Sequence, residues 1–238
     1  MKLTTVLFDL DGTLLPMNMD EFIRLYFGLM VKKLMPYGYP KEGLIKAIWT
    51  GTEAMVRNDG SKPNEQVFWD SFARNFGPEA LKDMPLFEEY YRNEFQNVKA
   101  ACGYTEMAKA TIEKCKALGL RVALATNPLF PAIATHSRIR WAGMAPEDFE
   151  LVTTYENSAS CKPNLLYYKE VMGKLGVVPE ECLMVGNDVA EDMIARHLGL
   201  RVFLLTPCLL NKHGEDIEQF PHGDFPELLK FLEQVAAE

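Results

Sequence analysis

The chain has 238 residues and a mass of 27.0 kDa, enough for one large domain or for a domain that carries an insertion. Its net charge of −8 argues against broad binding to nucleic acid or to an anionic membrane surface, because both need a basic face. No run of about 18 apolar residues is present, so we expect no membrane-spanning segment. With no secretory pattern at its start, the chain is expected to be cytoplasmic.

The five cysteines form no C-x-x-C pair and are odd in number, which favours free thiols over disulfides or a metal site. The four histidines are scattered without the spacing of metal ligands. Neither residue type predicts a metal centre, so candidate ligands have to come from other side chains.

The first predicted element is a short, buried strand over residues 3–9. It runs directly into two carboxylates, Asp9 and Asp11, which are costly to desolvate unless a positive charge lies between them. Residues two apart in an extended chain point to the same face, so both carboxylates face one way while Leu10 faces the core. Gly12 then allows the chain to turn beneath a ligand.

The pattern changes between residues 17 and 98, where apolar residues recur at helical spacing and no strand pattern is visible. Ser61 and Pro63 indicate a helix start, and Pro85 divides the segment at 78–97. We predict a compact unit of about four helices. Its aromatic stripe is expected to form the core of this unit rather than a substrate pocket. The stripe consists of Phe22, Tyr26, Phe27 and Trp49.

After Gly103 the chain alternates between helical and strand patterns. Strands that alternate with helices of about ten or more residues predict a parallel sheet wrapped by helices. The stretch at 211–223 is expected to be a surface loop. The predicted helices cover residues 105–118, 131–141, 164–175, 189–198 and 226–236, and the predicted strands cover residues 121–125, 150–154, 182–185 and 201–205.

The predicted fold class is α/β, with a Rossmann-like parallel sheet in a core domain built from residues 1–16 and 99–238. The all-α segment at 17–98 is then an inserted cap domain. Ligands of open α/β sheets bind outside the carboxyl ends of the strands, and the insertion leaves the sheet at that edge. It is therefore positioned to act as a lid.

Polar residues follow three of the predicted strands and precede one helix, and we expect them to converge on one edge of the sheet. They are Asp9 and Asp11 after the first strand, Thr126 and Asn127 after the second, Lys162 before the helix at 164–175, and Asn187 and Asp188 after the strand at 182–185.

These residue types suit phosphoryl transfer. Two nearby carboxylates repel each other, so a hard divalent cation is their natural neutraliser, and oxygen-only ligands favour Mg²⁺ over zinc. An aspartate in such a site can attack phosphorus and form an aspartyl-phosphate. The hydroxyl of Thr126 and the backbone N–H groups beside it, at Asn127, can hold phosphoryl oxygens. Lys162 supplies a positive charge that offsets Asp9 and the transferring group.

Here the chain resembles the haloacid dehalogenase-like hydrolase superfamily, and the order and spacing of the motifs match across the whole chain. An apolar strand followed by D-x-D-G-T is the most specific of them. The residues that carry the resemblance are Phe8-Asp9-Leu10-Asp11-Gly12-Thr13, Ala125-Thr126-Asn127, Lys162-Pro163, and Val185-Gly186-Asn187-Asp188 with Asp192.

The resemblance implies roles for the two acids. The first acid of the family is the nucleophile and the second is the general acid/base, so Asp9 would attack while Asp11 protonates the leaving alcohol and then activates water. The dehalogenase branch lacks the second acid, so Asp11 points to phosphate chemistry. Gly12, Thr13 and Asp192 are expected to support the site.

The last motif departs from the commonest pattern of the family, in which Gly-Asp is followed by a second Asp. Here Gly186 is followed by Asn187 and then by Asp188. Either Asn187 is a metal ligand through its amide oxygen, or the loop is shifted by one residue and Asp188 is the ligand, with Asp192 in support. We favour Asp188 because a carboxylate is the better Mg²⁺ ligand. The predicted metal ligands are therefore Asp9, Asp11, and Asp188 or Asn187.

The expected activity is Mg²⁺-dependent hydrolysis of a small phosphorylated metabolite, a phosphomonoester, by a monomer or homodimer. Three alternatives stay open. A phosphomutase of the same fold would pass the phosphoryl group to a sugar hydroxyl in place of water. A phosphonate hydrolase would need a lysine on the lid, for which Lys32, Lys33 and Lys46 are available. Asn187 also leaves room for a protein that binds phosphate with a weakened site.

Overall fold

The structure, a computed structural model, describes residues 2–237, and its centre is a five-stranded parallel sheet. The strands lie in the order β2-β1-β3-β4-β5, so the first strand of the chain lies between β2 and β3. The predicted parallel sheet is thereby confirmed. The strands are β1 (Thr5–Phe8), β2 (Arg121–Leu124), β3 (Cys182–Gly186), β4 (Arg201–Leu205) and β5 (His222–Gly223).

Eight α-helices accompany the sheet within residues 2–237, and none of them is long and apolar enough to cross a membrane. The α-helices are α1 (Met19–Leu34), α2 (Lys41–Val56), α3 (Asn64–Phe76), α4 (Met84–Arg92), α5 (Glu106–Ala117), α6 (Ala132–Trp141), α7 (Leu165–Leu175) and α8 (Phe225–Ala237). Short 3₁₀ helices lie at Met35–Tyr37, Pro78–Asp83, Glu94–Ala101, Pro146–Asp148, Pro179–Glu181, Met193–Leu198 and Ile217–Gln219.

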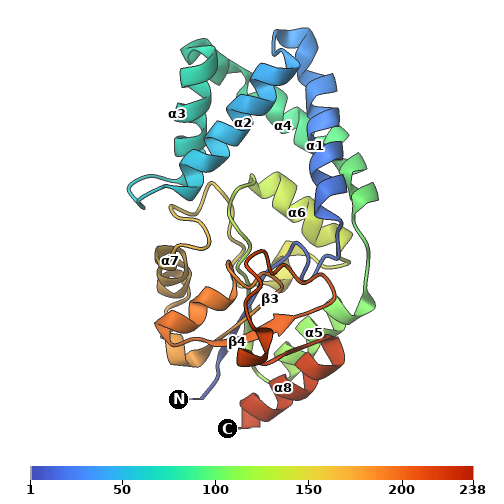
Figure 1. Cartoon of the computed structure of the whole chain (residues 1–238), viewed down its shortest axis with the longest axis vertical. Coiled ribbons are helices and arrows are strands. Elements are labelled where there is room, and N and C mark those ends of the chain that lie inside the picture. Colours follow the sequence, from blue (N-terminus) through green and yellow to red (C-terminus); the bar gives the residue numbers. More distant parts are fainter. Residues whose placement is uncertain (1, 238) are drawn as a thin grey trace.

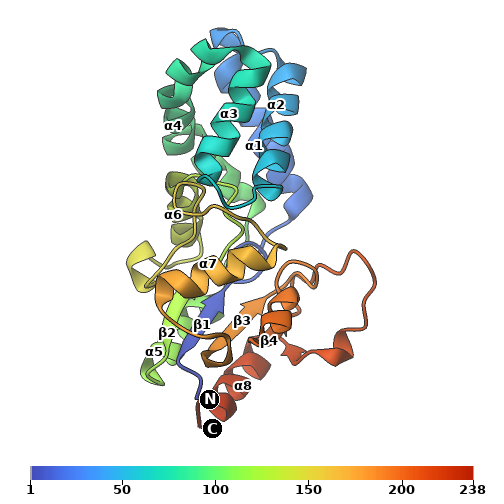
Figure 2. The same cartoon turned by 90° about the vertical axis from the view of Figure 1, so that its left-hand side faces the viewer.

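Helices cover both faces of the sheet, as Figure 1 and Figure 2 show. Val6 and Phe8 of β1 belong to the apolar cluster that includes residues of α5 and α8, whereas Leu7 belongs to the cluster that includes residues of α7. Successive strand side chains point to opposite faces of the sheet, and here both faces are buried under helices. This is why the strands are continuous apolar runs in the sequence rather than alternating ones.

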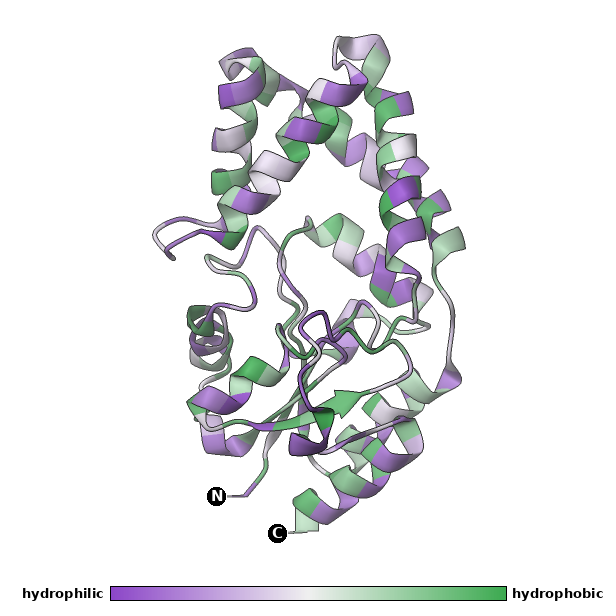
Figure 3. Ribbon diagram, viewed as in Figure 1, coloured by the Kyte–Doolittle hydropathy of each residue, from purple (hydrophilic) through white to green (hydrophobic). Residues whose placement is uncertain are grey.

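The elements from α1 to the 3₁₀ helix at Glu94–Ala101, called the helical unit below, lie together beyond one end of the sheet, and both chain ends lie at the opposite end (Figure 1, Figure 2). No strand occurs among the described residues of this unit. Apolar and polar residues alternate along each of its helices, as expected for helices with one buried face (Figure 3). The division of the chain at 16/17 and 98/99 stays a prediction.

The chain enters and leaves the helical unit at one place. The Gly103 N–H donates to the Pro16 carbonyl at 2.6 Å, and the Asn18 N–H donates to the Ala101 carbonyl at 3.1 Å. The two connections therefore run side by side next to the carboxyl end of β1. The helical unit is therefore connected to the sheet at the edge where the polar residues follow the strand ends.

Three local predictions are wrong or incomplete. Residues 150–154 lie beside β2 and make three backbone hydrogen bonds to Val122 and Leu124, but they form only an isolated bridge, at Val152, and not a full strand. The predicted helix at 189–198 is a 3₁₀ helix limited to Met193–Leu198, because the preceding residues form a turn around the side chains of an acidic loop. The predicted loop at 211–223 contains a 3₁₀ turn and the short strand β5.

Candidate active site

The register of the sheet aligns the ends of three strands. Phe8 of β1 is level with Leu124 of β2 and Val185 of β3. The residues that follow these strands therefore meet at one edge, between β1 and β3, where the direction of strand order reverses and where α/β sheets bind ligands. Seven of the predicted site residues line one cavity there, namely Asp9, Asp11, Thr126, Asn127, Asn187, Asp188 and Asp192.

Lys162 is the buried cation of this edge. Its Nζ lies 2.9 Å from Oδ1 of Asp9 and 2.6 Å from Oδ1 of Asp192, and the residue is only 1% exposed. Burial by itself lowers the pKa of Lys162, but the adjacent carboxylates of Asp192 and Asp9 outweigh it and raise that pKa well above its usual value. Lys162 is therefore an ammonium that joins Asp9 to Asp192.

Asp192 reaches Lys162 because Gly186 has no side chain. A Cβ at Gly186 would lie 2.1 Å from Oδ2 of Asp192. That same oxygen accepts a hydrogen bond from the Asp188 N–H at 2.9 Å. The glycine at the end of β3 thus lets the acidic loop fold back over the strand end, which is a structural reason for the Val-Gly that precedes the polar pair.

Asn187 is held at both ends of its side-chain amide. Its Oδ1 accepts from the Thr13 hydroxyl at 2.9 Å, and its Nδ2 donates to the Cys208 carbonyl at 2.7 Å. It also packs against Gly12, whose φ of +87° favours glycine and whose Cβ, if present, would lie 2.4 Å from Nδ2. Asn187 therefore ties the loop after β1 to the loops after β3 and β4.

Asp188 is half-buried and lies at the same cavity. Its Oδ1 accepts hydrogen bonds from the N–H groups of Ala190 at 2.8 Å and Glu191 at 3.0 Å. Its second oxygen takes no hydrogen bond from the described residues. Of the two neighbours, Asp188 has the oxygen that is open to a ligand.

Thr126 and Asn127 form the turn after β2. The Thr126 carbonyl accepts from the Thr153 hydroxyl at 2.7 Å and from the Tyr167 hydroxyl at 2.9 Å, so this turn is anchored in the core. Asn127 donates to Oε2 of Glu191 at 3.0 Å. Thr126 and Asn127 line the cavity from this anchored turn.

Asp11 forms an ion pair that the sequence analysis did not anticipate. Nη1 of Arg138, on α6, contacts Oδ2 of Asp11, and Arg138 is only 1% exposed. The guanidinium carbon of Arg138 lies 4.4 Å from the centre of the Phe130 ring, and Nη2 donates to the Thr135 hydroxyl at 3.2 Å. Arg138 is therefore fixed on three sides, and it fixes Asp11 in turn.

The other oxygen of Asp11, Oδ1, is buried without a hydrogen-bond partner among residues 2–237. Burial raises the pKa of Asp11, the charge of Arg138 opposes this, and the nearby Asp9 carboxylate adds to it. The two oxygens of Asp11 are thus unequal, since Arg138 engages one and the other is free.

The sequence alone gives no signal that selects Arg138. In the structure Thr135 and Arg138 lie three apart on the buried face of α6, where a charged residue requires a partner. Arg140 is exposed, and the sequence does not distinguish the two arginines without the orientation of the helix.

The donors at this edge fit a hard cation that is held by few protein groups. No group of three or more His, Cys, Asp or Glu side chains within residues 2–237 is arranged to hold a metal ion. Mg²⁺, however, keeps several waters and is usually held by one or two carboxylates together with the substrate phosphate. Asp9 and Asp188 line the same cavity, and the second oxygen of Asp188 is open to such a cation.

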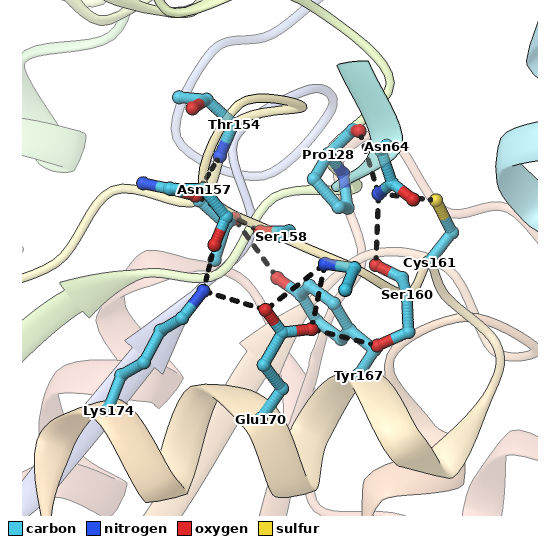
Figure 4. A network of polar contacts seen from close by, with 12 residues as sticks. Asn64, Pro128, Thr154, Asn157, Ser158, Ser160, Cys161, Tyr167, Glu170 and Lys174 are labelled. Carbon is cyan, nitrogen blue, oxygen red and sulfur yellow. Dashed lines mark hydrogen bonds and ion pairs between the residues drawn. The ribbon is translucent and has the colours of Figure 1, made fainter. Parts of the chain in front are cut away.

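The loop that presents Lys162 is held by α7 (Figure 4). The two carboxylate oxygens of Glu170 accept from the Ala159 N–H at 3.1 and 3.0 Å, and one of them accepts from the Ser160 hydroxyl at 3.0 Å. Lys174, one turn later on α7, lies 2.7 Å from Glu170. The approach to Lys162 is therefore rigid on the core side.

The helical unit holds the same loop through Asn64, the first residue of α3 (Figure 4). The fully buried side chain of Asn64 donates to the carbonyls of Ser160 at 3.3 Å and Pro128 at 3.4 Å, and to Sγ of Cys161 at 3.3 Å. The Glu65 N–H adds a hydrogen bond of 2.8 Å to the Tyr155 carbonyl. The start of α3 therefore contacts the loops that carry both Thr126 and Lys162.

The cavity extends from this edge under the helical unit, and its volume is about 780 Å³. The prediction that the aromatic stripe forms the core of the unit rather than a pocket is only partly right. Phe22 and Tyr26 are buried in the apolar core and Phe27 packs against it, but all four residues of the stripe also line the cavity. The rings contact one another and also border the open space, and Trp49 is 48% exposed. Periodicity predicted the buried face of α1 but not what lies opposite it.

The motifs and the fold agree with one known family. A family model described as haloacid dehalogenase-like hydrolase matches residues 3–197. The chain belongs to this family. This HAD-like hydrolase is 27% identical over 202 residues to the pyrophosphatase PpaX of Bacillus cereus, a match that covers 84% of this chain and 82% of that protein.

Solved structures share the fold of this HAD-like hydrolase. A HAD phosphatase from Thermococcus onnurineus superposes with a TM-score of 0.59 and 21% identity, covering 97% of this chain and 98% of that one. A 2-haloacid dehalogenase from Pseudomonas syringae pv. Tomato superposes with a TM-score of 0.63 and 16% identity, covering 98% and 99%. The fold is thus common to family members of different activity, so the reaction has to be argued from the site.

Proposed function

We propose that this HAD-like hydrolase is a Mg²⁺-dependent phosphatase that hydrolyses phosphomonoesters through an aspartyl-phosphate on Asp9. The observation that carries this proposal is the second acid, Asp11, which lies at the cavity with one oxygen engaged by Arg138 and the other unpartnered. A pyrophosphatase among the relatives and a phosphatase among the solved structures support phosphate chemistry.

In the first step, a carboxylate oxygen of Asp9 attacks phosphorus, and the bond between phosphorus and the oxygen of the leaving alcohol breaks. Asp11 donates its proton to that oxygen, so the product leaves as a neutral alcohol. Arg138 occupies Oδ2 of Asp11, which leaves Oδ1 to carry the proton. Burial raises the pKa of Asp11 and thereby favours the protonated form that this step needs.

In the second step, a water molecule attacks the phosphorus of the aspartyl-phosphate, and Asp11, now ionised, accepts the proton of that water. The bond between phosphorus and the Asp9 oxygen breaks, phosphate leaves, and both aspartates return to their starting states. Arg138 stabilises the ionised form of Asp11 between the two steps, which makes it a positioning residue of the reaction.

The phosphoryl group needs positive charge and hydrogen-bond donors around it. Lys162 offsets the charge of Asp9, to which it donates at 2.9 Å. Thr126 and the backbone N–H of Asn127 would bind phosphoryl oxygens from the anchored turn after β2. Gly12 and Thr13 would hold the nucleophile loop, and Asp192 would hold Lys162.

Bound Mg²⁺ would supply further charge at the phosphoryl group, and Asp9 and Asp188 would hold it. The sequence prediction also names Asp11 as a ligand, but Arg138 engages its Oδ2 and the proton transfer uses its Oδ1, so we assign Asp11 to the proton and not to the metal. Asp188 is preferred over Asn187 because both ends of the Asn187 amide are already hydrogen-bonded. Titration of Mg²⁺ against the Asp188→Ala and Asn187→Ala variants tests this choice. The greater loss of Mg²⁺ affinity is expected for Asp188→Ala, and an equal loss in both variants would contradict the assignment.

We also propose that the helical unit is a cap that closes the site and excludes water. A phosphonate hydrolase would need a lysine on this cap, and Lys32, Lys33 and Lys46 are absent from the residues that line the cavity. Lys33 is bound instead to Glu89 at 2.7 Å.

The test is hydrolysis of p-nitrophenyl phosphate with and without Mg²⁺. The proposal predicts release of p-nitrophenol that depends on the metal and is suppressed by chelator. Absence of turnover at every Mg²⁺ concentration, in protein that still binds phosphate, would favour the weakened phosphate-binding protein instead.

A further inference from the structure

The cavity is larger than a phosphoryl group requires. Its 780 Å³ lies in the upper part of the range of about 300–1,000 Å³ that is typical of sites for small organic ligands. The catalytic residues line only one end of it, and α1, α2, α3 and α4 contribute residues to the rest. The remaining space therefore belongs to whatever is esterified to the phosphate.

Aromatic rings form a continuous wall from the far side of this cavity to the catalytic acid. The distances between ring centroids are 5.5 Å from Trp49 to Phe27, 5.1 Å from Phe27 to Tyr26, and 5.6 Å from Tyr26 to Phe130. Phe130 stacks in turn on Arg138, the partner of Asp11. These rings, Trp49, Phe27, Tyr26 and Phe130, are called the aromatic wall below.

The charges around the same space are mostly negative. Apart from the predicted site residues, the lining contains five carboxylate residues, Asp20, Glu65, Glu88, Glu156 and Glu191. Burial raises the pKa of Glu65, and the charges of Glu156 and Glu88 add to the shift, so Glu65 lies within electrostatic reach of both.

Only two basic residues, Arg92 and Lys212, line the described cavity. Arg92 is already paired with Glu88 at 3.2 Å. A second anionic group on the substrate would therefore meet more carboxylates than unpaired cations. An apolar or ring-bearing group would instead meet aromatic surface.

We propose that the natural substrate is a phosphate monoester of a bulky, ring-bearing alcohol that carries no second anionic group. This inference rests on the proposed phosphatase function. This substrate class differs from that of the pyrophosphatase relative. In pyrophosphate the phosphoryl group is joined to a second phosphate, whereas here it would be joined to an organic group. Burial of the ring against the aromatic wall supplies binding free energy that small esters lack.

The test compares three esters of primary alcohols, whose leaving oxygens are similar: ethyl phosphate, 2-phenylethyl phosphate and 2-(4-carboxyphenyl)ethyl phosphate. We expect kcat/KM for the phenylethyl ester to exceed that for the ethyl ester by about tenfold to a hundredfold, the range expected from burial of one ring. We expect the added carboxylate to remove most of this gain. Ethylphosphonate and 2-phenylethylphosphonate, as inhibitors, should show the same preference without any chemical step.

Trp49→Ala locates the preference on the aromatic wall. Trp49 is half-exposed, so the change is tolerable to folding, and it should lower the ratio of the phenylethyl to the ethyl kcat/KM several-fold. Tyr37→Ala is the matched control, because Tyr37 is an exposed aromatic residue of the helical unit that lies outside the cavity lining. It should leave the ratio unchanged.

The outcomes separate this inference from the proposed function. Similar kcat/KM values for the ethyl and phenylethyl esters, or a preference for the carboxylated ester, would overturn the substrate class while the phosphatase function stands. An equal change of the ratio in Trp49→Ala and Tyr37→Ala would also overturn it. Absence of turnover of all three esters in protein that hydrolyses p-nitrophenyl phosphate would overturn the substrate class alone, whereas absence of turnover of p-nitrophenyl phosphate as well would overturn both proposals.

Discussion

The two ends of the cavity are built on different physical principles. At the charged end, Asp9, Asp11, Arg138, Lys162 and Asp192 are ionic groups that are held by partners within contact distance. On the aromatic wall, the contacts are apolar, individually weak and without strict direction. Removal of one charged partner leaves the other uncompensated, whereas removal of one ring leaves the others in place. The charged end should therefore tolerate almost no substitution, and the wall should tolerate several.

The largest expected effect is the loss of the nucleophile. Asp9→Asn should lower kcat for p-nitrophenyl phosphate by about 10³-fold or more, because no aspartyl-phosphate can form. Lys162 retains Asp192 as a partner, so the fold should persist. The control is Asp70→Asn, the same change in α3, where the Asp70 side chain is 44% exposed and pairs with Lys62. Activity in Asp9→Asn above a tenth of wild type would exclude the proposed route.

The next effect is on stability. Lys162→Met leaves Asp192 buried without its cation, and we expect the free energy of unfolding to fall by about 3–5 kcal/mol, measured by urea denaturation. Lys82→Met is the control, since its pair with Glu79 is exposed and contributes little. Equal unfolding midpoints for the two variants would show that the buried pair does not contribute to the stability of the charged end.

A smaller effect is expected for the positioning residue. Arg138→Gln releases Oδ2 of Asp11, and misplacement of the acid should lower kcat by about a hundredfold while KM changes little. Arg140→Gln, two residues later on the exposed face of α6, should leave both parameters unchanged. Unchanged kcat in Arg138→Gln together with a lower free energy of unfolding would assign Arg138 a structural role only.

The smallest effect is expected where the helical unit contacts the Lys162 loop. Asn64→Ala removes the hydrogen bonds to Ser160, Pro128 and Cys161, and we expect a loss of about 1–3 kcal/mol of stability. Hydrogen exchange of the Glu65 amide, which is bonded to Tyr155, should accelerate. Asn97→Ala, at an exposed residue of the same unit, is the control, and equal exchange rates in the two variants would argue against this anchor.

The charged end was largely predictable because its residues follow the ends of strands. Once the strands at 3–9, 121–125 and 182–185 are recognised, the parallel topology brings Asp9, Thr126 and Asp188 to one edge. The predictions failed where local pattern competes with side-chain contacts. Residues 189–198 are helical in composition, but the hydrogen bonds to Asp188 and Asp192 shape the chain first.

By itself, the sequence determined most of the strands and helices and their order, the helical segment after the first strand, and the two acids at the strand end. These are set by periodicity and by alternation along the chain, which are local properties. Only the tertiary structure decided that Arg138 holds Asp11, that Asn64 reaches the Lys162 loop, and that the aromatic stripe borders a cavity. Each of these joins residues far apart in the chain, and the orientation of a helix against its neighbours is fixed by packing rather than by its own sequence pattern.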